Sequence, residues 1–151
     1  MPEMIELKEL VDFLIHREES SASLFLRVAK TTRDSSLKDW FEEFYVETMR
    51  RRNNLIELKN TDANALTKKV PLASVRNYLV DMQTKEELTD SQALSLTILR
   101  ADTSIQLYSF MRTFVQSYNA QSLFRLFQEE LEAHRVRCSI LYDRILEIDS
   151  Y

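Results

Sequence analysis

The chain has 151 residues, a formal net charge of -4, 44% hydrophobic and 29% charged residues, and no glycine. Glycine-dependent sites such as the P-loop, the dinucleotide-binding fingerprint and the nucleophile elbow are therefore excluded, and hairpins that need positive φ angles are disfavoured. Interspersed acidic and basic residues argue against a nucleic-acid-binding surface. The single cysteine, Cys138, excludes an internal disulfide and any Cys-x-x-Cys metal site. This composition favours long helices joined by short polar loops.

The N-terminal half predicts two long helices. Apolar residues recur at helical spacing over about residues 4–31 and again over about 35–59, where Asp34 is a suitable N-cap. The first stripe is Leu7, Val11, Leu14, Phe25 and Val28, and the second is Leu37, Trp40, Phe44 and Leu58. Glu18 lies on the first stripe and Glu47 on the second, so each predicted core face carries one carboxylate.

The C-terminal half predicts a second pair of helices, over about residues 90–117 and 120–148. A crossover of about residues 60–89 precedes it, and we expect a short helix near residues 74–82 within this crossover. The two stripes are Leu94, Ile98, Ala101, Ile105, Tyr108, Met111 and Val115, then Phe124, Phe127, Leu131, His134, Cys138, Leu141 and Ile145. Hairpins over about 4–59 and 90–148 predict one all-α domain spanning 1–151, a four-helix bundle with ferritin-like connectivity.

Three polar residues on these core faces are candidate metal ligands: Glu18, Glu47 and His134. A buried charge is costly unless it is paired or bound to a metal, and inward carboxylates and histidines on several helices are typical of metal sites in bundle cores. For each of these three residues, an interpretation without metal binding also remains open. Glu18 could extend its head group to solvent, Glu47 could pair with Arg50 on the helix surface, and His134 could be a hydrogen-bonded core residue.

Several segments of the chain carry a resemblance to a known family, among them residues 17–25 and 32–41 and residues 128–134 with Leu141-Tyr142-Asp143. The first two resemble the first helical hairpin, and the others the last helix, of rubrerythrin-like proteins of the ferritin-like superfamily. The crossover stretches Val70-Pro71-Leu72 and Tyr78-Leu79-Val80-Asp81 are also similar, so the resemblance spans about residues 5–147. It implies a ferritin-like bundle with a di-iron site and, in a working member, peroxide reduction or ferroxidation.

The resemblance assigns the family's ligand positions to residues of this chain. Glu18, Glu47 and His134 match, whereas Arg50, Ala101 and Leu131 stand where ligands are expected; neighbouring carboxylates that could substitute are Glu19, Asp102 and Glu130. Arginine only donates hydrogen bonds and stays positively charged, so it repels a divalent cation. We therefore expect a buried Arg50 to neutralise Glu18 and Glu47 in place of metal, with Ala101 and Leu131 filling the remaining space by ordinary packing.

Two hypotheses for function follow, and the first is favoured. In the first, the degraded di-iron site leaves a non-catalytic or weakly metal-binding scaffold that acts by interaction or assembly, as a homodimer. In the second, a remodelled mononuclear or dinuclear site holds iron, or less readily zinc or manganese, and makes the protein an oxidoreductase supplied by an external electron donor. A helical binding module unrelated to metal is a third, weaker hypothesis. The chain lacks an apolar signal core and a membrane-spanning run, so we expect a cytoplasmic location without membrane or nucleic-acid partners.

Overall fold

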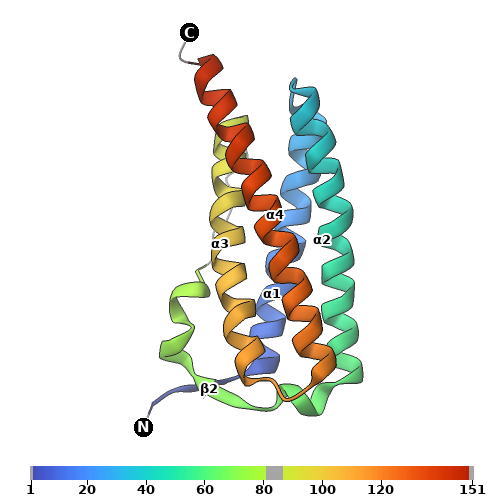
Figure 1. The fold of residues 1–151 in the computed structure, drawn as a ribbon, viewed down its shortest axis with the longest axis vertical. Coiled ribbons are helices and arrows are strands. Elements are labelled where there is room, and N and C mark those ends of the chain that lie inside the picture. Colours follow the sequence, from blue (N-terminus) through green and yellow to red (C-terminus); the bar gives the residue numbers. More distant parts are fainter. Residues whose placement is uncertain (1, 81–86, 150–151) are drawn as a thin grey trace.

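The computed structural model describes residues 2–80 and 87–149, and the side chains of residues 2–80 and 87–147. Four long helices lie along the same axis: α1 (Leu7–Thr31), α2 (Ser35–Thr61), α3 (Asp90–Phe114) and α4 (Tyr118–Asp149) (Figure 1). α1 and α2 form one antiparallel hairpin, α3 and α4 form the other, and the crossover joins them. The predicted all-α bundle of two hairpins is confirmed. None of the helices in the described part of the chain combines the length and apolarity needed to cross a bilayer.

The first helix begins later than its apolar spacing predicts. Glu6 and Glu9 form a capping box, in which the Glu6 side chain accepts from the N3 backbone and Glu9 accepts from the Glu6 N–H at 2.9 Å. The residues before the cap, Met4–Glu6, form strand β1, which pairs antiparallel with β2 (Lys69–Pro71). The predicted start at residue 4 is therefore wrong, because the cap satisfies the first helical N–H groups from Leu7 onward.

Side-chain caps also set the starts of the next two helices. The predicted N-cap Asp34 is confirmed, since its carboxylate accepts from the Leu37 N–H at 3.0 Å. Thr89 and Gln92 form a second capping box at the start of α3. α3 ends at Phe114 rather than near residue 117, because Val115 is already extended with φ -74° and ψ 134°.

The crossover lacks the predicted α-helix over residues 74–80. Short 3₁₀ turns occupy Ala63–Leu66, Leu72–Ser74 and Arg76–Tyr78 instead, and residues 81–82 of that prediction lie outside the described residues. Leu72, Val75 and Tyr78 are spaced by three, which matches the three residues per turn of a 3₁₀ helix. All three pack against the same hydrophobic cluster, so this spacing lets one short segment cover the bundle.

A polar layer divides the bundle core into two hydrophobic clusters. The lower cluster is built from residues 7–15 of α1, 55–58 of α2, 105–111 of α3 and 120–131 of α4. The upper cluster is built from residues 24–29, 37–44, 93–94 and 138–141 of the same helices. Between them lie buried polar side chains, listed in chain order: Arg17, Glu18, Thr48, Arg51, Thr97, Arg100, Ser104 and His134. The candidate site therefore occupies the middle of the bundle.

Arg17 ties the crossover to this layer. Its Nη2 donates to the carbonyl oxygens of Tyr78 at 3.0 Å and Val80 at 2.9 Å. Its Nη1 donates to the hydroxyls of Thr103 at 2.8 Å and Ser104 at 3.2 Å on α3. One side chain of α1 thus holds both the crossover and the second hairpin.

We expect Arg17→Met to lower the free energy of unfolding by about 2–4 kcal/mol, because it leaves two crossover carbonyls without their donor. Urea unfolding measures this loss, and limited proteolysis should cut the crossover faster. Arg125→Met on the exposed face of α4 is the control, with a change within about 0.5 kcal/mol. Equal losses in the two variants would show that the tether contributes nothing.

Candidate functional site

The buried cation of α2 is Arg51 and not Arg50. Arg51 is 1% exposed, whereas the Arg50 side chain is 43% exposed, so the predicted burial of Arg50 is wrong. The buried stripe of α2 is Leu37, Phe41, Phe44, Thr48, Arg51, Leu55 and Leu58. Trp40 and Glu47, which the sequence places on the core stripe, are only half-buried at its edge. A shift of one position turns a helical side chain by about 100°, which explains the exchange of Arg50 for Arg51.

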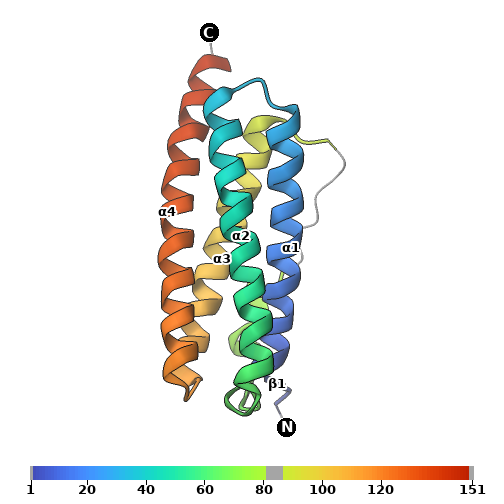
Figure 2. The same ribbon diagram turned by 90° about the vertical axis from the view of Figure 1, so that its right-hand side faces the viewer.

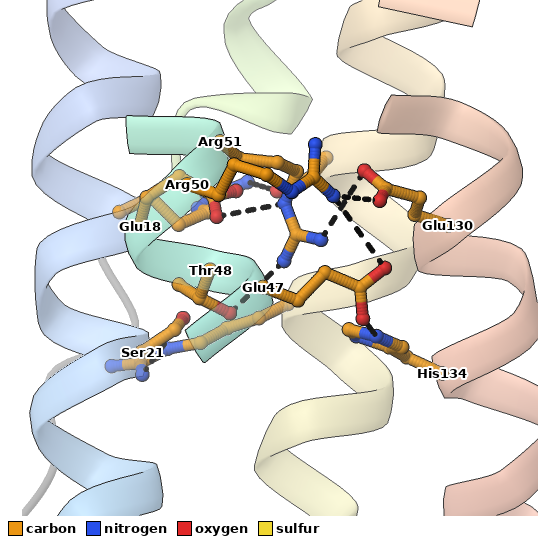
Figure 3. A network of polar contacts seen from close by, with 11 residues as sticks. Glu18, Ser21, Glu47, Thr48, Arg50, Arg51, Glu130 and His134 are labelled. Carbon is orange, nitrogen blue, oxygen red and sulfur yellow. Dashed lines mark hydrogen bonds and ion pairs between the residues drawn. The ribbon is translucent and has the colours of Figure 1, made fainter. Parts of the chain in front are cut away.

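Arg51 lies among acceptors from three helices (Figure 3). Its Nε donates to Glu18 Oε2 on α1 at 3.0 Å, and its Nη2 donates to Thr48 Oγ1 at 3.0 Å. Its Nη1 lies 3.8 Å from Glu130 Oε1 on α4. Glu18 is 3% exposed, so Arg51 and Glu18 form an ion pair that is buried on both sides. The neutralisation predicted for Glu18 is therefore present, with Arg51 as the cation.

The other two predicted ligands meet beside this pair. His134 Nε2 contacts Glu47 Oε2, and the imidazole stacks on the ring of Phe44 with centroids 4.0 Å apart. Arg50 Nη2 bonds to Glu130 Oε2 and lies 3.9 Å from Glu47 Oε1. His134 is buried, whereas Glu47 and Arg50 reach the surface between α2 and α4. Two arginines and one histidine thus face three carboxylates.

Glu47 and Glu130 have opposite pKa shifts. Burial raises the pKa of Glu47, but hydrogen bonds with His134 and Glu130 and the nearby positive charges outweigh burial and lower this pKa to about 2. Burial, together with the hydrogen bond and repulsion from Glu47, raises the pKa of Glu130 to about 7 despite Arg51 and Arg50. Below about pH 7 the pair therefore keeps a proton, held mainly by Glu130.

Two of the weaker candidate ligands lie on the surface, and the two apolar residues at expected ligand positions line a small cavity. Glu19 pairs with Arg52 at 3.4 Å on the outside of the bundle, and Asp102 pairs with Arg135 at 2.7 Å, so neither points to the buried ion pair. Ala101 and Leu131 border a cavity of about 20 Å³, together with polar side chains of the buried layer. That volume suits about one water molecule. The prediction that Ala101 and Leu131 fill this space by packing is therefore only partly correct.

Six members of the polar layer were not predicted from the sequence: Arg17, Thr48, Arg51, Thr97, Arg100 and Ser104. A signal for two of them was present, because Thr48 and Arg51 follow Phe44 by four and seven residues and so share its face. In an arginine run of three, that spacing singles out the middle arginine.

A di-iron centre does not fit the residues that surround this layer. Within residues 2–80 and 87–149, no group of three or more histidine, cysteine, aspartate or glutamate side chains is placed to hold a metal ion. The guanidinium of Arg51 lies against Glu18, and arginine offers no lone pair to a metal. Ala101 and Leu131 also supply no ligand atom.

Comparisons with known proteins bear on the fold. No protein-family model matches this sequence, and no curated protein matches it. Among solved structures, the chain is similar to a crystal structure from Thermotoga maritima described as a ferritin-like diiron-carboxylate protein, with a TM-score of 0.77 over 95% of this chain and 98% of that chain. The two sequences are 11% identical. This chain has the ferritin-like fold.

In this ferritin-like bundle, we expect Arg51→Met to lower the free energy of unfolding by about 3–5 kcal/mol, because it leaves the buried Glu18 carboxylate without its ion-pair partner. Removing both charges in Glu18→Leu/Arg51→Met should recover much of that loss. Urea unfolding of the two single variants and the double variant gives the coupling energy.

The matched control lies one residue further along each helix. Arg52 and Glu19 form a similar pair at 3.4 Å, but their side chains are 32% and 43% exposed. The same cycle on this pair should give a coupling below about 1 kcal/mol. Equal coupling energies at the two sites would contradict a structural role for the buried pair.

The pKa shifts also predict how stability changes with pH. Between pH 4.5 and about 7 the folded chain keeps a proton on Glu130 that the unfolded chain has lost, so this stabilising contribution falls as pH rises through that window. For Glu47 the sign is reversed, and its contribution is lost as pH falls from 4.5 toward about 2. Glu130→Gln should flatten the slope of unfolding free energy between pH 5 and 7, measured by urea titration. Glu129→Gln, at an exposed neighbour, should leave it unchanged.

Proposed function

We propose that this chain is a rubrerythrin-like bundle in which the Arg51 guanidinium replaces the di-iron centre, and that it acts as a non-catalytic scaffold through association with protein. The observation that carries this proposal is the Arg51–Glu18 ion pair, buried at mid-height of the bundle. A permanent cation attached to α2 supplies the positive charge that inward carboxylates require.

The charge of the site supports this proposal. Di-iron sites of this fold class surround their metals with carboxylates from all four helices and two histidines. Here three carboxylates, Glu18, Glu47 and Glu130, face the cations of Arg50 and Arg51. A divalent ion added beside a buried guanidinium would be repelled strongly, because the surrounding dielectric is low.

A mononuclear metal site is the alternative, favoured by the contact between one carboxylate and one imidazole. Glu47 contacts His134, and the Glu47 side chain is 29% exposed and so reaches the surface. A carboxylate and an imidazole suit iron or zinc. In this alternative the protein would be an oxidoreductase supplied with electrons by another protein.

Metal analysis tests the two proposals. We expect protein purified aerobically without chelators, and again after reconstitution with ferrous iron, to contain far less than one metal ion per chain by elemental analysis. One or more ions per chain in the wild type, lost in Glu47→Ala, would overturn the metal-free scaffold and support the mononuclear site.

Removal of the internal cation gives a second test. Arg51→Ala leaves Glu18 without its partner and opens space beside Glu130, so we expect this variant to bind a divalent cation that the wild type rejects. Zinc titration followed by calorimetry measures the gain. Arg52→Ala, which removes an outward arginine, is the matched control and should behave as the wild type.

A further inference from the structure

We infer that the outward face of α2 and α4 binds an amphipathic helix of another protein, in which basic residues stand on both sides of an apolar stripe. This inference rests on the proposed function, because it names the partner of the scaffold by its chemistry. α2 and α4 lie side by side along the bundle (Figure 2). Their outer surface combines exposed apolar side chains with carboxylates that have no ion-pair partner among the described residues.

Two ion pairs show how the helices are aligned. Glu43 of α2 pairs with Arg137 of α4 at 3.0 Å. Seven residues further along α2, Arg50 bonds to Glu130, which lies seven residues back along α4, so the two helices are antiparallel. Arg137 also lies over the ring of Trp40, 4.5 Å from its centroid. The arginines of this seam are therefore matched by groups of the chain itself.

An apolar stripe runs along the outside of α4. Leu126, Ala133 and Ile140 are spaced by seven, and Val136 lies three residues after Ala133. This is the spacing of a seam against which a second helix packs. Leu126 is 42% exposed, Val136 55% and Ile140 59%, so nothing in the described part of the chain covers them fully. From residue 126 to residue 140 the stripe extends about 20 Å, the length of about four helical turns.

Val46 widens this stripe toward α2. Val46 and Ala133 each lie three residues after a carboxylate of the seam and four before an arginine of it. Residues three and four apart share a helix face, so the two side chains lie at the same level, between the two ion pairs. Val46 is 68% exposed. We call the following residues the α2–α4 outer face: Val46, Leu126, Ala133, Val136 and Ile140.

Carboxylates border the α2–α4 outer face and outnumber the cations there. Five of them, exposed or half-buried, have no ion-pair partner among the described residues: Asp39, Glu42, Glu129, Glu132 and Asp143. Each lies three, four or seven residues from a member of the outer face, and so on the same side of its helix. Two cations, Lys38 and Arg125, are also unpaired in the described part of the chain and stand one turn before Glu42 and Glu129. An excess of three negative charges therefore remains.

This charge decides which occupant fits. A second copy of the face would set these carboxylates against one another, and the phosphates of nucleic acids and acidic lipids would be repelled. Lysines and arginines beside the apolar stripe of a partner would instead meet the carboxylates with opposite charge. A helix is the fitting shape, because packed helices leave no unpaired backbone edge to which a strand could add. Burial of the exposed apolar side chains then supplies affinity, and the charges select the partner.

Two synthetic peptides test the inference. Both carry leucines at spacings of three and four over about four turns, and their other positions are all lysine in one peptide and all glutamate in the other. We expect the full chain to bind the lysine peptide only. The dissociation constant should rise about tenfold in Glu42→Gln/Glu129→Gln, which removes two bordering charges, and in Ile140→Ser, which removes apolar contact. Fluorescence anisotropy of labelled peptide measures it, and circular dichroism establishes that each variant is folded.

Matched substitutions lie outside the α2–α4 outer face. Glu3→Gln/Glu87→Gln removes two exposed carboxylates elsewhere, and Leu99→Ser removes an apolar side chain that is 52% exposed on α3. Both variants should bind the lysine peptide as the wild type does. In NMR spectra of the wild type, the amide shifts caused by the peptide should concentrate on residues 39–50 and 126–143.

Equal binding of the two peptides, no binding of the lysine peptide, or amide shifts outside α2 and α4 overturns the inference. So does a dimer of the free wild-type chain that Ile140→Ser breaks, since a second copy would then occupy this face. The metal analysis is a separate test, because these variants leave Arg51 and Glu18 intact. Metal in a wild type that binds the lysine peptide overturns the metal-free scaffold and keeps this inference. A metal-free chain that binds neither peptide does the reverse.

Discussion

The buried guanidinium of Arg51 is the constraint on which the middle of this bundle depends. A fully buried arginine is stable only where acceptors meet its N–H groups, and here Glu18 and Thr48 accept at 3.0 Å while Glu130 lies 3.8 Å away. These partners stand on α1, α2 and α4, so one side chain sets the relative height of three helices. The hydrophobic clusters above and below contain mainly aromatic and aliphatic residues, whose burial is non-directional. The polar layer therefore adds directional contacts between helices at the middle of the bundle.

The fold could be predicted from the sequence because its signals repeat over many residues. Each helix carries an apolar stripe several turns long, so an error at one position does not alter the helix, and the absence of glycine removes most competing architectures. The crossover is different. Leu72, Val75 and Tyr78 offer only a few apolar positions, and their spacing of three fits a 3₁₀ turn as well as the edge of an α-helix. Start and end residues depend on caps such as the Glu6–Glu9 box, whose geometry only the structure displays.

The site could be predicted only in part, since it depends on single positions. Glu18 and His134 are buried in the polar layer as expected, but in the Arg50-Arg51-Arg52 run the buried residue is Arg51 and not the predicted Arg50. The resemblance drew attention to Arg50, which stands at a family ligand position, whereas the spacing from Phe44 through Thr48 leads to Arg51. Glu130 shows the same limit. It is one residue from the matched position Leu131, and its approach to Arg51 depends on how α4 packs against α2, which no spacing rule contains.

An internal arginine and a bound metal can each neutralise carboxylates that point into a bundle core. They differ in how the stability of the bundle depends on pH and on the supply of the ion. A metal site requires deprotonated ligands and an external supply of the ion, so its stability depends on pH and on loading. Arginine stays charged over the whole physiological range and is made with the chain, so the bundle folds with its central charge already present. The cost is chemical, because a guanidinium offers no open coordination position and no change of oxidation state. In the function that we propose, the bundle exchanges reactivity for a core that needs no cofactor.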